Sequence, residues 1–193
     1  CNGAACFLDH EQVYKNLLDR DQLDAFVQEA HHEQIDTAFV SLDNIKRSSS
    51  NDVTVMEEAM HSFGAVLPEL DQFFAEEQEI YQALAFFDQT YDGKFSSYDK
   101  IRFVRWHENS VDVVPKNGSK AATILHLAEQ VGIPHEDIIS FGDGQNDREM
   151  LRMSGIGIAM GNAVPEVQAE AKMVTDTNDQ DGIWKALKEL SVI

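Results

Sequence analysis

The feature that most constrains this chain is the stretch 141–147, which reads Phe-Gly-Asp-Gly-Gln-Asn-Asp. The apolar run at 137–141 leads into it and predicts a strand buried on both faces. Good helix formers follow at 147–153, and Asn146 is the expected N-cap of that helix. Asp143 is therefore expected where a parallel strand ends and a helix begins, which is the edge of an α/β sheet at which ligands bind.

The same stretch groups oxygen ligands. Asp143 and Asp147 are four residues apart and the amide of Asn146 lies between them. Hard cations such as Mg²⁺ prefer oxygen ligands. An isolated Asp-Gly pair more often only shapes a turn, but the complete string after a buried strand is more specific. We therefore interpret Asp143, Asn146 and Asp147 as candidate ligands of Mg²⁺.

Composition excludes several classes of partner. The chain has 193 residues, and 15 basic against 34 acidic residues give a net charge of −19. This charge argues against binding to nucleic acid or to anionic membranes, and a phosphate substrate would need local cations. No apolar run approaches the ~20 residues of a membrane span, and no secretory signal is visible. With only two cysteines, a reducing, cytoplasmic location is expected.

The order of elements predicts an α/β fold in more than one part. Residues 1–16 predict a hairpin, and residues 17–114 interleave strands and helices, which favours an antiparallel or mixed sheet. After Pro115 the order is regular and predicts a parallel sheet with right-handed crossovers. Residues 46–52 are expected to be a loop. Helices are predicted at 21–31, 53–63, 70–77, 119–131, 147–153, 165–172 and 181–190, and strands at 35–42, 78–88, 101–106, 111–114, 137–141, 155–160 and 173–175.

Lys120 is a second candidate for chemistry. It opens the helix predicted at 119–131, and Ser119 is the expected N-cap. A cation at a helix start opposes the helix dipole at a small cost, which suggests that the side chain is directed at an anion. The alternative is an ordinary surface lysine.

Together, the loop at 141–147, Lys120 and the Ala-Met-Gly-Asn-Ala stretch at 159–163 resemble the haloacid dehalogenase (HAD) superfamily of phosphohydrolases, in its Cof-like branch, subfamily IIB. The resemblance is strong over 109–193 and only suggestive over 1–108. It implies a three-layer, Rossmann-like core with a parallel sheet and an α/β cap domain. Residues 17–114 would be the cap, 115–193 the C-terminal part of the core, and 1–16 a remnant of the core.

The resemblance also implies an activity and a set of site residues. Members of the family hydrolyse phosphate monoesters of small metabolites, such as sugar phosphates, through an aspartyl-phosphate and with Mg²⁺. Here Asp143 would bind Mg²⁺, and Asn146 and Asp147 would support it through the metal, its waters or Lys120. Lys120 would hold the phosphate. The loop at 178–182, which contains Asn178, would border the site, and an equally good alternative is that it only caps the helix that follows. Lys120 and Asp147 are thus the candidate catalytic residues, and Lys120, Asn146 and Asn178 the candidate phosphate contacts.

One part of the family pattern is missing. No Asp-x-Asp-Gly-Thr string, which would carry the attacking aspartate, occurs in these residues. We expect this chain to lack the first part of the core domain, to be inactive alone, and to expose a sheet edge that could pair in a homodimer. Two other functions remain open: a non-catalytic Mg²⁺-binding or interaction domain, and a phosphomutase of the same superfamily.

Overall fold

The computed structural model describes residues 2–193. The chain divides into two compact units, one formed by Cys1–Ala5 and Lys15–Gly118 and the other by Cys6–Tyr14 and Ser119–Ile193. We call them the cap unit and the core unit. The predicted N-terminal hairpin is present, with β1 (Ala5–Leu8) and β2 (Glu11–Lys15) forming a two-stranded sheet. None of the helices in residues 2–193 has the length and apolar character needed to cross a bilayer.

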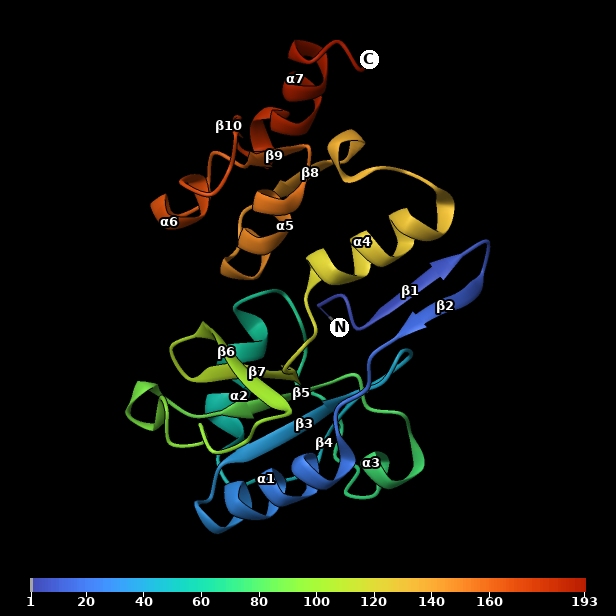
Figure 1. The fold of residues 1–193 in the computed structure, drawn as a ribbon. Coiled ribbons are helices and arrows are strands. Elements are labelled where there is room, and N and C mark those ends of the chain that lie inside the picture. Colours follow the sequence, from blue (N-terminus) through green and yellow to red (C-terminus); the bar gives the residue numbers. More distant parts are fainter. Residues whose placement is uncertain (1) are drawn as a thin grey trace. The chain divides into compact units, whose positions relative to one another are not determined.

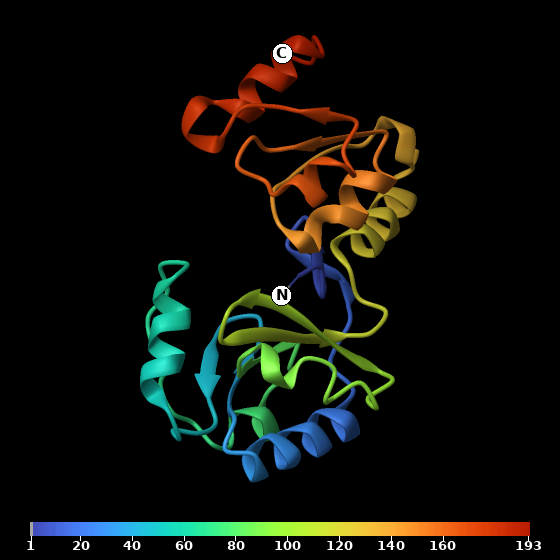
Figure 2. The ribbon, with the colours of Figure 1, turned by 90° about the vertical axis from the view of Figure 1, so that its left-hand side faces the viewer.

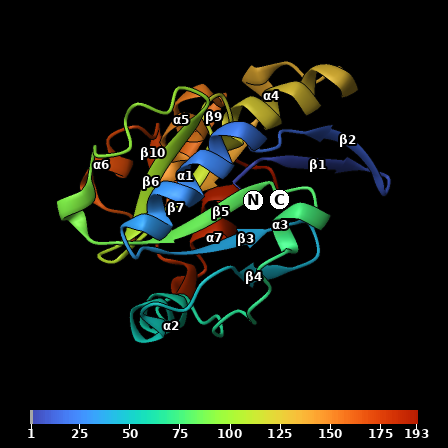
Figure 3. The ribbon, with the colours of Figure 1, turned by 90° about the horizontal axis from the view of Figure 1, so that it is seen from below.

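The cap unit is built on one antiparallel sheet of five strands in the order β4-β3-β5-β7-β6. Helices cover parts of both faces, with α1 and α2 on opposite sides of the strands (Figures 1, 2 and 3). The strands are β3 (Asp36–Val40), β4 (Ile45–Arg47), β5 (Gln82–Phe86), β6 (Ile101–His107) and β7 (Ser110–Pro115), and the helices are α1 (Arg20–His32), α2 (Val53–His61), α3 (Phe74–Glu77) and the 3₁₀ turn η1 (Gln89–Tyr91).

Two apolar cores result from the alternation of side chains along the central strand β5. Ala83 and Ala85 pack with Phe26 of α1 on one face of the sheet. Leu84 and Phe86 pack with the methionines of α2 on the other face. Because both faces are buried, β5 reads as a continuous apolar run, which is why periodicity alone could not tell which residues face which helix.

The core unit contains the predicted parallel sheet, in the order β10-β9-β8. Helix α7 lies on the other side of these strands from α4 and α5 (Figures 1 and 2). The strands are β8 (Ile139–Gly142), β9 (Ile156–Ala159) and β10 (Met173–Val174), the helices are α4 (Lys120–Val131), α5 (Arg148–Met153), α6 (Pro165–Gln168) and α7 (Gly182–Glu189), and the 3₁₀ turns are η2 (His135–Asp137), η3 (Gln145–Asp147) and η4 (Asn178–Gln180).

Capping residues confirm several predicted helix boundaries. Asp52 accepts a hydrogen bond from the N–H of Val55 at 3.3 Å at the start of α2. Pro165 stands in the first turn of α6. Gly132 ends α4 with a positive φ of 73°, the left-handed conformation that favours glycine. Capping depends on residues within a few positions of the helix end, so these boundaries could be predicted from the sequence.

Other predictions were wrong in ways that tertiary pairing explains. The expected loop at 46–52 begins with part of β4, because Arg47 pairs with Ala38 of β3. The strand expected at 78–88 is only β5, since pairing with β3 begins at Gln82. Helix α3 covers only the end of the predicted 70–77, and α6 ends before the predicted residue 172.

Asn146 is not the N-cap of α5. It lies within η3, and Asp147 takes the N-cap position without capping the helix through its side chain. The short 3₁₀ turn delays the helix, and the Asp147 carboxylate has other partners.

Candidate active site

The carboxyl ends of the parallel strands bring two loops together. Asp143 directly follows β8, and Asn162 follows β9 in the next loop. The Met160 N–H donates to the carbonyl oxygen of Gly142 at 2.9 Å, and Nδ2 of Asn162 donates to Oδ2 of Asp143 at 2.8 Å. Asp143 is exposed at this edge of the sheet. Asn162 was not among the predicted site residues, although its place after a parallel strand was a usable signal.

Asp147 is the most constrained side chain of the site. It is only 5% exposed. Its Oδ1 accepts from the ammonium of Lys120 at 2.6 Å, and its Oδ2 accepts from the backbone N–H groups of Asp143 and Gly144, each at 3.0 Å. A buried carboxylate is stable only when paired and hydrogen-bonded in this way. One side chain thus joins the start of α4 to the loop that follows β8.

Lys120 is placed by the helix that it opens. Ser119 caps α4 by accepting from the N–H of Ala122 at 3.1 Å, as predicted. The Lys120 side chain remains 33% exposed while it contacts Asp147. An ammonium has three donors, so a bound anion can share it with the Asp147 carboxylate.

Two glycines allow the loop to close this tightly. A Cβ at Gly142 would lie 2.5 Å from Cβ of Asp147, and a Cβ at Gly144 would lie 2.6 Å from Oδ1 of Asn146. The Cβ of Asp147 cannot move without the backbone, so close packing against Asp147 requires glycine at 142. At 144 the contact is with the end of the Asn146 side chain, which could move aside.

The donor set fits a cation that needs few protein ligands. No group of three or more His, Cys, Asp or Glu side chains within residues 2–193 could hold a metal ion. The carboxylates of Asp143 and Asp147 and the amide of Asn146 supply oxygen atoms in this loop, and the Asp143 side chain is exposed. Mg²⁺ keeps several waters and is often bound through one or two carboxylates together with substrate phosphate. These oxygen donors are compatible with that mode of binding.

Asn178 lies on the same edge of the sheet but is not joined to the Lys120–Asp147 pair. It belongs to η4, which follows β10, and its Nδ2 donates to Oδ1 of Asp179 at 3.3 Å. The Gly161 N–H donates to the carbonyl oxygen of Asp176 at 3.2 Å, which ties this loop to the one after β9. No hydrogen bond recorded for residues 2–193 links Asn178 to the candidate metal ligands.

Comparison with known proteins supplies independent information. A family model described as haloacid dehalogenase-like hydrolase matches residues 1–187. A Bacillus subtilis (strain 168) protein named "Putative phosphatase YkrA" is 35% identical over 192 residues, which cover 100% of this chain and 74% of that protein.

Solved structures match over the full chain. A hypothetical protein from Geobacillus kaustophilus HTA426 is 38% identical with a TM-score of 0.89, and the match covers 100% of this chain and 75% of that one. The HAD subclass IIB sugar phosphatase BT4131 is 31% identical with a TM-score of 0.85, and the match covers 100% of this chain and 74% of that one.

Proposed function

The chain belongs to the haloacid dehalogenase-like hydrolases, and we propose that it carries the metal- and phosphate-binding part of a Mg²⁺-dependent phosphatase. The proposed substrate is a small phosphorylated metabolite such as a sugar phosphate. The names of YkrA and of the sugar phosphatase BT4131 support this class of reaction.

The observation that carries the proposal is the ion pair of Lys120 and Asp147 beside the exposed Asp143 carboxylate. We assign Mg²⁺ binding to Asp143, with Asn146 as a supporting oxygen donor. Lys120 holds the phosphate, and Asp147 positions both the ammonium and the loop. Asn146 and Asn178 are the other two proposed phosphate contacts.

Mg²⁺ and Lys120 would supply the positive charge that phosphoryl transfer requires. Bound Mg²⁺ would neutralise negative charge on the transferring group, and most of the catalysis in such reactions comes from positioning and charge stabilisation. Asp147 holds the Lys120 ammonium in place before a substrate binds, so that little reorganisation is needed. In a chain with a net charge of −19, bound Mg²⁺ together with the Lys120 ammonium would offset the field that repels phosphate.

The attacking carboxylate is not assigned to these residues, because they contain no Asp-x-Asp-Gly-Thr string. We therefore expect residues 1–193 alone to show no phosphatase turnover. Mg²⁺-dependent turnover by exactly this chain, lost in Asp143→Ala, would contradict that expectation. If the protein binds Mg²⁺ but hydrolyses no phosphate ester in any form, it is instead a non-catalytic member of the family.

Ligand binding tests the proposal without requiring turnover. Isothermal titration of the 193-residue chain with Mg²⁺ should show that Asp143→Ala weakens binding by at least about tenfold. Titration with inorganic phosphate in the presence of Mg²⁺ should show a loss of similar size in Lys120→Ala, since hydrogen bonds to charged groups contribute about 1.5–3 kcal/mol.

The matched control is Asp137→Ala, which removes an exposed aspartate of the same unit just before β8. It should bind Mg²⁺ as the parent chain does. Circular dichroism of each variant shows whether a loss reflects unfolding. Equal Mg²⁺ affinity in the parent and in folded Asp143→Ala would refute the assignment of this ligand.

A further inference from the structure

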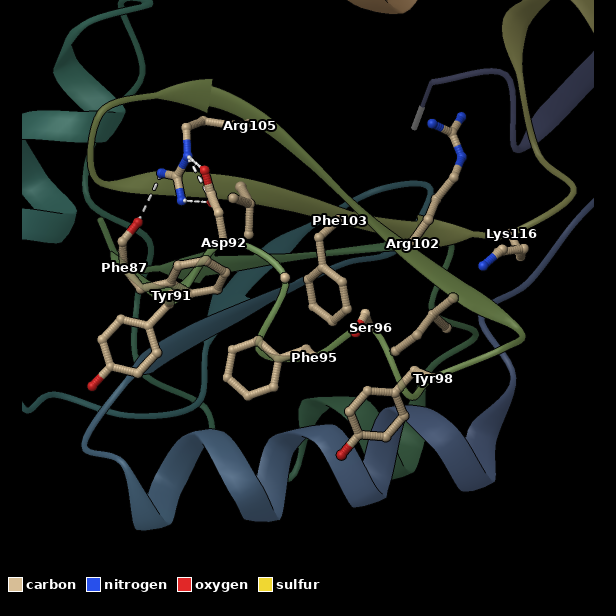
Figure 4. A pocket seen from close by; sticks show the side chains of 13 residues that line it. Phe87, Tyr91, Asp92, Phe95, Ser96, Tyr98, Arg102, Phe103, Arg105 and Lys116 are labelled. Atoms are coloured by element: carbon tan, nitrogen blue, oxygen red, sulfur yellow. Dashed lines mark hydrogen bonds and ion pairs between the residues drawn. The ribbon is translucent and has the colours of Figure 1, made fainter. Parts of the chain in front are cut away.

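The cap unit contains a cavity of about 360 Å³ that the proposed phosphate chemistry does not use. It lies between the segment 91–98 and the sheet, on the side of the sheet that faces α1 (Figure 4). Its volume is within the range of sites that bind small molecules. All of its lining residues belong to the cap unit.

Five of the thirteen lining residues are aromatic, namely Phe87, Tyr91, Phe95, Tyr98 and Phe103. The rings of Phe95 and Phe103 lie 5.5 Å apart between centroids, and those of Tyr98 and Phe103 lie 6.5 Å apart. The hydroxyl of Tyr98 donates to Oε2 of Glu29 in α1 at 2.8 Å. Because its hydroxyl has this partner, Tyr98 offers a ligand in the cavity its aromatic ring. A planar ring inserted here could extend the edge-to-face and offset packing that aromatic side chains prefer.

The two ends of the cavity differ in charge. At one end the guanidinium of Arg105 is neutralised by Asp92, with Nη2 and Oδ1 2.6 Å apart, and it also donates to the carbonyl oxygen of Phe87 at 2.9 Å. Lys116 lies at the other end (Figure 4). No carboxylate of residues 2–193 is within 4.0 Å of its ammonium in any recorded ion pair.

The charge of the lining contrasts with that of the chain. Three basic residues and one acidic residue line the cavity, whereas acidic residues outnumber basic ones by 34 to 15 in the whole sequence. The side chain of Arg102 points away from the rings (Figure 4) and donates to the carbonyl oxygen of Gly118 at 2.7 Å. Lys116 is thus the cation best placed to attract a negative group.

We propose that this cavity binds a small aromatic anion, with its ring against the aromatic side chains that line the cavity and its charged group toward Lys116. The shared chemistry is a flat ring that carries one anionic group, whether phosphate, sulfonate or carboxylate. This site shares no residue with the phosphate site proposed for the core unit and does not depend on it.

The test uses 1-naphthalenesulfonate as the probe, because a sulfonate cannot be hydrolysed as a phosphate ester. Binding to the full chain is measured by isothermal titration, alongside neutral 1-naphthol, methanesulfonate as an anion without a ring, and 1-naphthyl phosphate.

Ser96→Phe fills the cavity from an exposed lining position, and Ser97→Phe is its matched control, since the adjacent exposed serine does not line the cavity. Lys116→Gln removes the cation, and Lys100→Gln removes a cation of the same unit that pairs with Asp19 outside the cavity.

The proposal requires one equivalent of 1-naphthalenesulfonate to bind and Ser96→Phe to abolish that binding. Lys116→Gln should weaken the sulfonate about three- to fivefold, as expected for one partly exposed ion pair, and should leave 1-naphthol unchanged. Absence of sulfonate binding, or equal losses in Ser96→Phe and Ser97→Phe, would overturn it.

Asp147→Asn separates this proposal from the phosphate chemistry. The variant should retain sulfonate binding whether or not it still binds phosphate. Loss of the sulfonate from folded Asp147→Asn would overturn the separate cap site. Binding of 1-naphthyl phosphate that survives in Asp147→Asn and is lost in Ser96→Phe identifies the cap cavity as one place where a phosphate ester binds.

Discussion

At the scale of single residues, Asp112 of β7 shows how burial changes a side chain. Its carboxylate accepts from Nδ2 of Asn2 at 2.6 Å and from Nε2 of Gln82 at 2.8 Å. Burial raises the pKa of Asp112 from 3.8 to about 6, and these hydrogen bonds only partly oppose that effect. Nothing in the alternating sequence of β7 marks this position as different from an exposed aspartate.

The raised pKa of Asp112 predicts a pH dependence of stability. The folded protein holds the Asp112 proton more tightly than the unfolded chain, so the free energy of unfolding contributed by this group falls as pH rises from 3.8 to about 6. The loss should be on the order of 1–3 kcal/mol. Urea unfolding at about pH 4 and about pH 7 should show that Asp112→Asn removes this decrease. Asp43→Asn, at an exposed position, should keep it, and an equal decrease in Asp112→Asn and the parent would contradict the assignment.

At the scale of elements, the core unit depends on a close approach of α5 to β9. A Cβ at Gly157 would lie 1.9 Å from the carbonyl oxygen of Leu151, a backbone atom that cannot move aside alone. Leu151 itself is fully buried against Ala159 and Val167. The helix therefore packs directly on the backbone of the strand, which holds the loop between β8 and α5 in its position.

This packing predicts a large effect of Gly157→Ala. The added methyl must displace the end of α5, so the free energy of unfolding should fall by about 3 kcal/mol or more in denaturant titration. Gly132→Ala is the comparison, because nothing lies within 4 Å of its Cβ position and only its positive φ of 73° resists the change. That variant should lose about 1–2 kcal/mol. A Gly157→Ala loss no larger than that of Gly132→Ala would show that α5 can shift freely.

At the scale of the whole molecule, charge and core organisation act together. A net charge of −19 creates self-repulsion that opposes the compact state. The cap unit has apolar clusters around α1 and α2, and the core unit has a separate one around Leu151. Each unit is therefore stabilised by its own apolar core, while repulsion among the negative charges of the chain destabilises the folded state.

The charge predicts that salt stabilises the protein. Raising the ionic strength from about 0.01 M to about 0.15 M shortens the Debye length from about 30 Å to about 8 Å, so the thermal unfolding midpoint should rise. Calorimetry in potassium chloride and in choline chloride should give the same rise, since screening does not depend on the identity of the cation. A midpoint that falls or stays constant in both salts would show that self-repulsion does not limit the stability of the protein.

Much of the fold could be predicted from local sequence. The strand, loop and helix around Asp143, the helix starts at Asp52 and Ser119, and the parallel sheet after Pro115 follow from hydrophobic periods and capping residues, which act over a few neighbours. The net charge and the family motif could also be read directly from the sequence. Mg²⁺ binding and the role of Asn178 remain predictions.

Tertiary structure decided how these pieces meet. The pairing of Lys120 with Asp147 and the contact of Asn162 with Asp143 join residues from different elements. The raised pKa of Asp112 and the aromatic cavity beside Lys116 also require the strands and loops to be assembled. Local periods and caps are encoded by nearby residues, whereas burial and charge pairing depend on which distant segments pack together.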